Sequence, residues 1–326
     1  MRIAVTGSIA TDHLMRFPGR FTDQLLADRL DHVSLSFLVD DLDIRHGGVA
    51  ANIAHGLGRL GLTPLLVGAA GTDFEEYGRR LKADGVDISG VRVSGTRRTA
   101  RFLCLTDRDG NQIAAFHSGA MTEAREIDLA PLAVGTRPDL LLVCANDPDA
   151  MARHTRQARD LGLSFAADPS QQLARLTGQQ ILDLVDGARW LFTNEYEAAL
   201  LTEHTGRPPE DILRRVGAWV TTLGPRGVRV ERRCGPPLLV PAVPRERVTD
   251  PTGAGDGFRA GFLAALAHGL SVTAAARLGC AVASGVLGSP GSQGYPADSA
   301  ALSASIRETY GATAAAELAP ALGGAT

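Results

Sequence analysis

Short apolar runs alternate with amphipathic stretches along most of the 326-residue chain. The runs have the length of strands, whereas apolar positions in the stretches between them recur every three or four residues, as on one face of a helix. This alternation is typical of βαβ units and predicts an α/β fold with a mostly parallel sheet and helices on both faces. Strands are expected at Ile3–Gly7, Pro64–Gly68, Asp139–Cys144, Leu163–Ala167, Trp190–Thr193 and Trp219–Leu223.

Helices are expected in the stretches between these strands. Thr177 and Gln180 have the spacing of a capping box, in which each side chain bonds the other residue's backbone amide. The predicted helices lie near 50–60, 74–84, 148–161, 178–187 and 195–204, followed by two Ala-rich ones at 254–268 and 272–287. The Ala-rich residues at the end of the chain are expected to form a tail.

Two segments break this rhythm. Val33–Val39 alternates apolar and polar residues at period two, and Thr99–Thr106 and Gln112–Phe116 flank a polar turn that is typical of a hairpin. We expect these strands to form a small separate β-sheet, inserted at about 13–46 and 96–118 of a single domain spanning 1–326. A sheet that projects from an α/β core is suited to act as a lid and as the contact of a homodimer.

The composition is that of a soluble globular protein, with 44% hydrophobic residues, 21% charged residues and a net charge of −3. There is no basic excess for nucleic acid, no basic amphipathic stretch for a membrane surface and no apolar run long enough to span a membrane. The four cysteines are scattered without a CxxC pair, and the first residues lack a signal-peptide pattern. These features favour a reducing, cytoplasmic location.

Lys82 is the only lysine, which excludes several nucleotide-binding classes. A P-loop needs Gly-Lys-Ser/Thr, and Lys82 follows Leu81 instead. A protein-kinase lysine or a pyridoxal-phosphate Schiff base would have to use the same residue, in a stretch that has the pattern of an exposed helix face. Nucleotide chemistry in this chain must therefore use backbone amides and arginine.

The strongest chemical signal is the stretch Asp250-Pro251-Thr252-Gly253-Ala254-Gly255-Asp256, in which a long predicted helix begins. Unshielded N–H groups at a helix N-terminus form a ready site for an anion. Asp256 would repel a phosphate there unless it takes a proton from the nucleophile that attacks the phosphate. The stretch therefore predicts phosphoryl transfer to a hydroxyl group, and an N-capping aspartate after a glycine-rich turn is the alternative.

Two pairs of residues near the N-terminus fit such a site. Gly48 precedes a predicted helix and lets a ligand approach the backbone, while Asn52 offers a donor and an acceptor. Ser8 and Asp12 follow the first predicted strand, where open α/β sheets bind ligands. The Asp12 carboxylate can accept two hydrogen bonds from a vicinal diol. Each of these residues, taken alone, also fits an ordinary loop or cap.

Two further signals lie in the second half of the chain. Asn194 and Glu197 are three residues apart at the start of a predicted helix, where they can hold Mg²⁺ through its waters. The same pair also fits a first turn whose acidic residue complements the helix dipole. Thr222, Gly224 and Gly227 form a tight turn after a predicted strand and can receive a nucleotide, although a turn of this kind is uninformative alone.

Together these motifs resemble the ribokinase-like (PfkB-type) carbohydrate and nucleoside kinases. The motifs that carry the resemblance, in order, are Gly47-Gly48…Asn52, Asn194-x-x-Glu197, Thr222-x-Gly224-x-x-Gly227 and Asp250…Gly253-Ala254-Gly255-Asp256. The resemblance covers nearly the whole chain and implies a ribokinase-like fold with a lid. Segments 5–14, 34–41 and 167–173 resemble bacterial adenosine kinases more narrowly. Arg226 stands where relatives often have lysine and Pro251 where many have a second threonine, and neither departure removes an anion-hole glycine.

The resemblance also implies a role for each motif residue. Asp256 would be the base for the ribose 5′-hydroxyl, and the amides of Gly253, Ala254 and Gly255 would hold the charge on the transferred phosphoryl group. Asn194 and Glu197 would organise Mg²⁺, and K⁺ is raised as an activating cation. Adenosine would contact Ser8, Asp12, Ser36, Gly48, Asn52, Phe102, Phe116, Gln171, Gln172 and Asp256. The co-substrate ATP would contact Asn194, Thr222, Gly224, Gly227, Gly255 and Arg175.

Three functions compete at this stage. The first is ATP-dependent 5′-phosphorylation of adenosine in purine salvage, which Phe102 and Phe116 favour because a purine gains about 1–3 kcal/mol per stacked base. The second is a ribokinase- or fructokinase-type sugar kinase, and the third is a non-catalytic nucleoside-binding protein, for which Asp256 would have no use. A Rossmann dehydrogenase is excluded because the turn after the first strand lacks GxGxxG.

Overall fold

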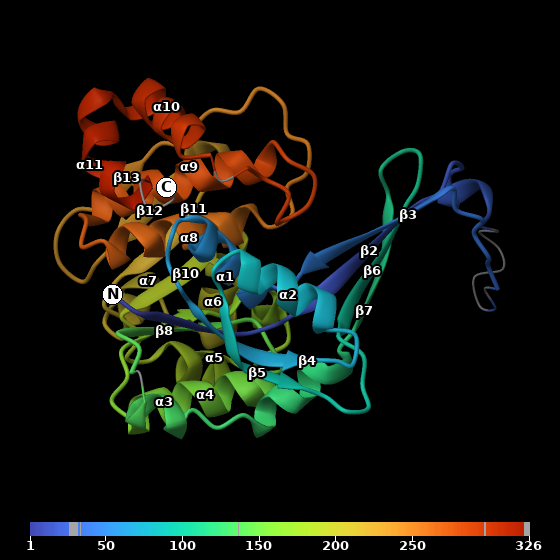
Figure 1. Cartoon of the computed structure of the whole chain (residues 1–326), viewed down its shortest axis with the longest axis horizontal. Coiled ribbons are helices and arrows are strands. Elements are labelled where there is room, and N and C mark those ends of the chain that lie inside the picture. Colours follow the sequence, from blue (N-terminus) through green and yellow to red (C-terminus); the bar gives the residue numbers. More distant parts are fainter. Residues whose placement is uncertain (26–31, 33, 136, 297, 323–326) are drawn as a thin grey trace.

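The computed structural model describes residues 1–25, 32, 34–135, 137–296 and 298–322. These residues form a large sheet between two layers of helices, from which a second, small sheet projects (Figure 1). Within these residues the large sheet has nine strands, ordered β13-β12-β11-β10-β9-β8-β1-β4-β5. The strands from β11 to β5 in this order are parallel, and β12 and β13 add to one edge in antiparallel fashion. They are β1 (Ile3–Thr6), β4 (Leu65–Ala70), β5 (Asp87–Val93), β8 (Leu140–Cys144), β9 (Phe165–Asp168), β10 (Trp190–Asn194), β11 (Trp219–Thr222), β12 (Val228–Glu231) and β13 (Leu238–Val240).

Helices cover both faces of the large sheet because its strands are apolar on both sides. Alternate residues of β1 belong to different cores: Val5 packs with the first layer of helices, and Ala4 packs with the second. The first layer consists of α1 (Val49–Arg59), α2 (Glu75–Ala83), α8 (Ala254–Ala267), α9 (Val272–Leu287), α10 (Ser299–Tyr310) and α11 (Ala312–Leu322). The second consists of α3 (Ala130–Val134), α4 (Pro148–Asp160), α5 (Gly178–Val185), α6 (Glu195–Thr205) and α7 (Pro209–Leu213).

The small sheet projects from one side of this core, to the right in Figure 1. Its strands are ordered β3-β2-β6-β7, formed by β2 (Ala10–Arg16), β3 (Asp41–Gly47), β6 (Ala100–Thr106) and β7 (Gln112–His117). β6 and β7 pair in antiparallel fashion across the turn at 107–111, so the predicted hairpin is confirmed. The prediction of an α/β fold with a mostly parallel sheet and a separate smaller sheet is likewise confirmed.

The strand predicted at Val33–Val39 is wrong. Residues 34–39 are irregular, Val33 lies outside the described residues, and the strand of this segment is β3, which begins at Asp41. Both segments alternate apolar and polar residues, but only one can occupy the edge of β2, and β3 takes it. Phe37 packs instead against the rings of Phe17 and Phe21, at 5.0 and 5.2 Å between centroids.

The prediction of a C-terminal tail is also wrong. The Ala-rich residues form α10 and α11, because alanine has a high helix propensity and Leu302, Ile306 and Leu318 reach the core. The capping box at the start of α5 is confirmed, since Thr177 and Gln180 each bond the other's backbone amide. Strands β2, β5, β12 and β13 were not among the predicted ones.

Candidate active site

At the N-terminus of α8 the backbone amides of Gly253 and Gly255 have no partner among the described residues, and that of Ala254 makes a long bond, of 3.4 Å, to the carbonyl of Pro251. Gly253 is the N-cap with φ of +78°, a left-handed conformation that favours glycine, and no side chain caps this helix end. A Cβ at Gly253 would also collide with the Cβ of Ser292, so the turn lies tightly against the 291–293 segment. The first amides of a helix have no partner within it, so those around Gly253 to Gly255 can accept an anion.

Asp256 stands in the first turn of α8, beside these amides. Its Oδ2 accepts a hydrogen bond of 2.8 Å from Nδ2 of Asn52, on α1. The Oδ1 of Asn52 accepts from Oγ of Ser292 at 2.9 Å and from Nε2 of Gln293 at 2.8 Å. Because two donors hold that oxygen, the amide of Asn52 must direct its N–H groups toward Asp256. The structure therefore brings Asp256 and Asn52 together, as the motifs predicted.

The same chain of hydrogen bonds continues to the root of the small sheet. Gln293 also donates to the hydroxyl of Tyr77 at 2.6 Å, and Tyr77 donates to the carbonyl of Gly47 at 3.0 Å. Gly47 ends β3, and Gly48 after it has φ of +97°, where a Cβ would lie 2.6 Å from backbone atoms of Ser8 and Ala10. The carboxyl of Asp256 is thus linked through buried groups to the point where the small sheet joins the core.

Burial raises the pKa of Asp256 to about 7. The positive charge of Arg259 and the hydrogen bond from Asn52 oppose this effect, whereas the negative charges of Asp168 and Asp12 add to it. A carboxyl with a pKa near neutrality exchanges its proton readily at physiological pH, which suits a general base. The surroundings of Asp256 therefore give it the properties of a general base near neutral pH.

One row of side chains crosses the small sheet on a single face. The register pairs Arg45 with Asp12, Asp12 with Phe102, and Phe102 with Phe116. Directly paired residues point to the same side of a sheet, so a carboxylate and two aromatic rings lie next to one another. The register thus places Phe102 and Phe116, both predicted adenosine contacts, on one face of the small sheet.

Asp12 and Arg45 connect this row to the anion site. Burial, followed by the charge of Asp250, raises the pKa of Asp12 to about 6, and Arg45 opposes the change. Arg45 donates from Nη1 to Oδ2 of Asp250 at 3.3 Å, and that oxygen also accepts from the amide of Gly291 at 3.0 Å. Asp250 further accepts from the amide of Thr252 at 2.9 Å, which shapes the turn before Gly253.

A cavity of about 480 Å³ opens on the other side of the anion site. It is bounded by the turn after β11, the start of α8 and residues of α9. Gly227, with φ of +97°, lets this turn touch the backbone of Val240, because a Cβ there would collide with the Val240 carbonyl. The structure thus gathers four predicted nucleotide contacts, Thr222, Gly224, Gly227 and Gly255, around one cavity.

Asn194 and Glu197 form a reciprocal capping box at the start of α6. The amide of Asn194 donates to Oε2 of Glu197, and the amide of Glu197 donates to Oδ1 of Asn194, both at 2.8 Å. One carboxylate oxygen of Glu197 stays free for a water-bound cation, while no group of three His, Cys, Asp or Glu suited to a metal exists among the described residues. This donor set fits Mg²⁺, which usually keeps several waters and binds one or two carboxylates plus substrate phosphates.

The other predicted contacts are placed less uniformly. Ser8 is buried and its Oγ accepts from the amide of Val49, at the start of α1. Gln172 is buried and donates to the carbonyl of Asn146 at 2.8 Å, whereas Gln171 and Arg175 are exposed. Ser36 is exposed on the irregular segment 34–39. The structure gives no contact that joins Ser36, Gln171 or Arg175 to Asp256, so their roles stay predictions.

Comparison with known proteins identifies the family. Residues 6–299 match the pfkB family carbohydrate kinases. The chain belongs to this family. It is similar to the Burkholderia thailandensis nucleoside kinase bound to inosine, with a TM-score of 0.84 and 33% identity over 95% of this chain and 98% of that one. A Methanocaldococcus jannaschii nucleoside kinase is 31% identical over 76% of this chain and 81% of its own, and Bacillus subtilis ribokinase is 30% identical over 76% and 83%.

In this pfkB-family kinase the motifs missed two sets of residues near Asp256. Ser292 and Gln293, which orient Asn52, lie 240 and 241 residues from it, and no local pattern marks them. The buried ion pair between Arg259 and Asp168 was missed as well. A lone arginine within the apolar stretch 258–262 was the available signal, because a charge on a buried helix face needs a partner.

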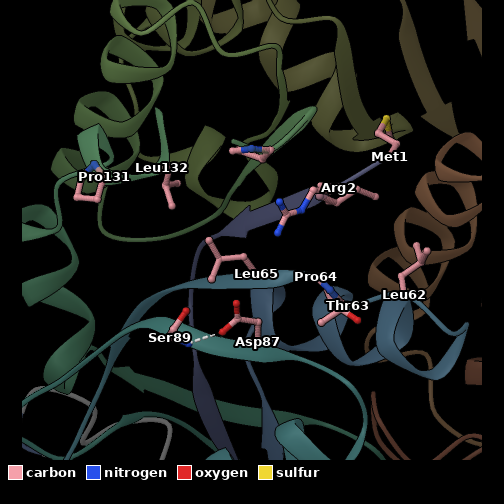
Figure 2. A pocket seen from close by; sticks show the side chains of 12 residues that line it. Met1, Arg2, Leu62, Thr63, Pro64, Leu65, Asp87, Ser89, Pro131 and Leu132 are labelled. Atoms are coloured by element: carbon pink, nitrogen blue, oxygen red, sulfur yellow. Dashed lines mark hydrogen bonds between the residues drawn. The ribbon is translucent and has the colours of Figure 1, made fainter. Parts of the chain in front are cut away.

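A second cavity, of about 350 Å³, lies at the amino ends of strands of the large sheet, opposite the anion site. Figure 2 shows it between the starts of β1, β4 and β5, with Arg2, Asp87 and Ser89 among its polar residues. Asp87 accepts from the amide of Ser89 at 2.9 Å. In open α/β sheets the ligand site lies beyond the carboxyl ends of the strands, so this cavity at their amino ends is separate from the site of the kinase.

Within the described residues, no helix is long and apolar enough to cross a membrane.

Proposed function

We propose that this kinase transfers the γ-phosphoryl group of ATP to the 5′-hydroxyl of adenosine, giving AMP and ADP. The observation that carries the proposal is the row of Asp12, Phe102 and Phe116 on one face of the small sheet. A carboxylate that accepts from a ribose diol, followed by two rings that stack on a flat base, matches a nucleoside better than a free sugar. Asp12 also lies near enough to Asp256 for its charge to raise the pKa of that carboxyl.

The chemistry follows from the start of α8. Asp256 takes the proton of the 5′-hydroxyl while that oxygen forms a bond to the γ-phosphorus, and the bond from this phosphorus to the bridging oxygen of ADP breaks. The amides of Gly253, Ala254 and Gly255 hold the charge on the transferred group. Asn52 directs one N–H at Asp256 and keeps the other for the ribose, together with Asp12 and the backbone at Gly48. The small sheet closes over the acceptor and excludes water.

The cavity around Gly224 and Gly227 would receive the donor nucleotide. Its walls are formed largely by small apolar side chains and by two glycines with left-handed φ, which let a nucleotide lie close to the backbone. Asn194 and Glu197 would hold Mg²⁺ through its waters, and the cation would neutralise the donor phosphates. Arg175 would reach the same phosphates.

The relatives support a nucleoside as acceptor. The Burkholderia thailandensis nucleoside kinase has been solved with inosine and with ADP and inosine together, and the latter structure is 34% identical with a TM-score of 0.81. Inosine is therefore the second acceptor to consider. AMP formation from a free nucleoside is salvage chemistry, which we place in the cytoplasm because all four cysteines are free thiols.

The proposal is tested with the purified protein, Mg·ATP and a panel of adenosine, inosine, guanosine, ribose and fructose 6-phosphate. ADP release is followed, with and without K⁺, and with Mg²⁺ removed by chelation as the control. We expect turnover on adenosine that exceeds turnover on either sugar by at least about 100-fold. Efficient turnover on ribose would support the sugar-kinase alternative, and binding of adenosine without ADP release would support a binding protein.

Truncation of the two rings should separate the nucleoside from the sugar. Phe102→Ala and Phe116→Ala are each expected to raise KM for adenosine about 10- to 100-fold, since a stacked base is worth about 1–3 kcal/mol. KM for ribose, measured with high acceptor concentrations, should stay within about threefold. Leu103→Ala is the matched control, because Leu103 follows Phe102 on β6 and points to the opposite face. Equal losses on both acceptors would show that the rings only pack the small sheet.

We also propose that a second copy of this chain covers the outer face of the small sheet. The register places Leu42, Met15, Leu105 and Ile113 in one row on the face opposite Asp12 and Phe102. Leu42 and Ile113 are 57% and 50% exposed, and Ile44 in the adjacent row is 57% exposed. An apolar sheet face of this kind is unfavourable in water and suits a self-complementary contact across a twofold axis.

Sedimentation velocity tests this contact. The wild-type chain is expected to sediment as a dimer at micromolar concentration, and Ile44→Asp as a monomer, because the change buries a carboxylate against apolar side chains. Val134→Asp is the control, since Val134 is 89% exposed and lies on α3, in the helix layer. A monomeric wild type would contradict the proposed dimer.

A further inference from the structure

A buried ion pair lies directly behind the anion site. Arg259 is one turn beyond Asp256 on α8, and its Nη2 donates to Oδ1 of Asp168, at the end of β9, at a distance of 2.6 Å. Arg259 is 5% exposed and Asp168 is fully buried. The guanidinium carbon lies 5.7 Å from the centre of the Phe192 ring. A Cβ on Gly255 would be only 2.8 Å from Nη1 of Arg259, so this arginine lies against the backbone of the anion site.

The pair is not fully satisfied by its surroundings. Nε of Arg259 and Oδ2 of Asp168 are both buried without a hydrogen-bond partner. Oδ1 of Asp168 also accepts from Oγ of Ser170 at 2.9 Å, and Ser170 has φ of +46°, a strained conformation for a residue with a side chain. A buried ion pair often contributes no more to stability than apolar residues of the same size. The geometry therefore points to a role for the charge beyond holding the fold.

We propose that Arg259 is a positioning residue that acts through Asp256: its guanidinium, held by Asp168 against the backbone of Gly255 and one turn along α8 from Asp256, favours the ionised form of that carboxyl. Asp168 holds the guanidinium in place and moderates its charge. This inference rests on the proposed function, because it assigns Arg259 to the base of that reaction. Arg259 does not touch the substrate, and its guanidinium lies behind the anion site.

The direction of each charge effect on Asp256 follows from the groups that face it. Arg259, on the same helix, lowers the pKa of Asp256, and the hydrogen bond from Asn52 on α1 lowers it too. Asp168 on β9 and Asp12 on β2 raise that pKa. The charge of Asp256 also affects the pKa of three buried groups, which are uncharged at neutral pH. They are Tyr77, Tyr295 and Cys144, and burial raises the pKa of each further above neutrality. Removing Arg259 and removing Asp168 should therefore move the titration of Asp256 in opposite directions.

The test is the pH dependence of kcat/KM for the acceptor, which reports the pKa of the base in the free enzyme. In Arg259→Met the acid limb is expected to move up by about one pH unit or more, since an adjacent opposite charge lowers the pKa of a carboxyl by about 1–3. Because the wild-type pKa is about 7, an increase of one unit in this pKa should lower activity at pH 7 about fivefold, with a larger loss for a larger increase, and activity should recover as the pH rises above the new pKa. In Asp168→Asn the acid limb should move to lower pH.

Two further variants keep the test decisive where Arg259→Met does not fold. Arg259→Lys retains the charge and should restore the wild-type acid limb, and Arg259→Met combined with Asp168→Asn removes both charges of the ion pair together, so neither partner is left without the other. The double variant should have an acid limb between those of the single variants. Arg277→Met is the matched control, because Arg277 lies on α9 and pairs with Glu317 of α11. An acid limb that is identical in all folded variants would overturn the proposal.

A second readout separates this inference from the proposed function. ¹³C NMR of protein labelled at the aspartate carboxyl carbons follows the titration of Asp256 directly, and Asp256→Asn identifies its signal. Without any substrate present, the pKa of Asp256 read from this signal is expected to be higher in Arg259→Met and lower in Asp168→Asn than in the wild type. If the wild type shows no turnover but the two variants change the pKa of Asp256 in this way, the proposed reaction is rejected and the role of Arg259 is retained. If the pKa of Asp256 is the same in all variants, that role is rejected.

Discussion

Asp256→Asn is expected to lower kcat by about 10²- to 10⁴-fold, the usual effect of a positioned base, while adenosine still binds. The asparagine carbonyl can accept the hydrogen bond that Asn52 donates at 2.8 Å, so the site keeps its shape. Its amide cannot take a proton from the 5′-hydroxyl. Because the carboxyl that Asp256 provides titrates near neutrality, the wild type should also lose activity as the pH falls below about 7.

Single-turnover kinetics and calorimetry check this result together. In Asp256→Asn the single-turnover rate of phosphoryl transfer should fall by about 10²- to 10⁴-fold, while the Kd for adenosine changes by less than about fivefold. Asp12→Asn is the matched variant, because Asp12 is proposed to hold the ribose. It should raise KM more than it lowers kcat. Near-normal turnover in Asp256→Asn would contradict the assignment of the base.

Gly253→Ala is expected to lower kcat by about 10²- to 10³-fold, the loss that follows removal of an oxyanion-type donor. A side chain at φ of +78° costs about 1–3 kcal/mol in strain, and its Cβ would collide with Ser292. The turn can relieve the collision only by moving its amides away from the position of the transferred phosphoryl group. Steady-state kinetics and thermal unfolding measured together separate the loss of turnover from the loss of stability.

The other end of the same helix provides the control. Gly269 has φ of +75°, and a Cβ there would meet no atom within 4 Å. Gly269→Ala therefore carries the same kind of backbone strain without a collision and far along the chain from the anion site. It should lower the unfolding temperature and leave kcat within about twofold. A comparable loss of kcat in both variants would show that strain in α8, and not the displaced amides, is responsible.

Local patterns predicted those parts of the molecule whose residues are neighbours in sequence. The inner strands of the large sheet were found because they are apolar on both faces and are separated by helical periodicity, whereas β5, β12 and β13, toward its two edges, were missed. The pairing of Phe102 with Phe116 follows from a turn that joins Thr106 to Gln112, so the hairpin sets its own register. The start of α8 was recognisable because Gly253 to Asp256 combine an anion site and a base within four residues.

Other parts of the site depend on long-range packing that a single sequence does not display. Asn52, on α1, is oriented by Ser292 and Gln293, which follow α9 in the chain and lie about 240 residues away from it in sequence. Arg259 pairs with Asp168, 91 residues away. The lone arginine in the apolar stretch 258–262 indicates that a partner is needed, but no local pattern indicates which residue it is. The competition between Val33–Val39 and β3 for the edge of β2 was likewise decided by the tertiary structure, since both segments have the same alternating pattern.

The most direct test of the central claim is ³¹P NMR of the purified protein with Mg·ATP and adenosine. The account predicts a new monophosphate resonance, split into a triplet by the two 5′ protons, that grows together with ADP and is absent with Asp256→Asn. Release of inorganic phosphate alone, or a doublet from a phosphate on a ring hydroxyl, would contradict phosphoryl transfer to the 5′-hydroxyl at this site.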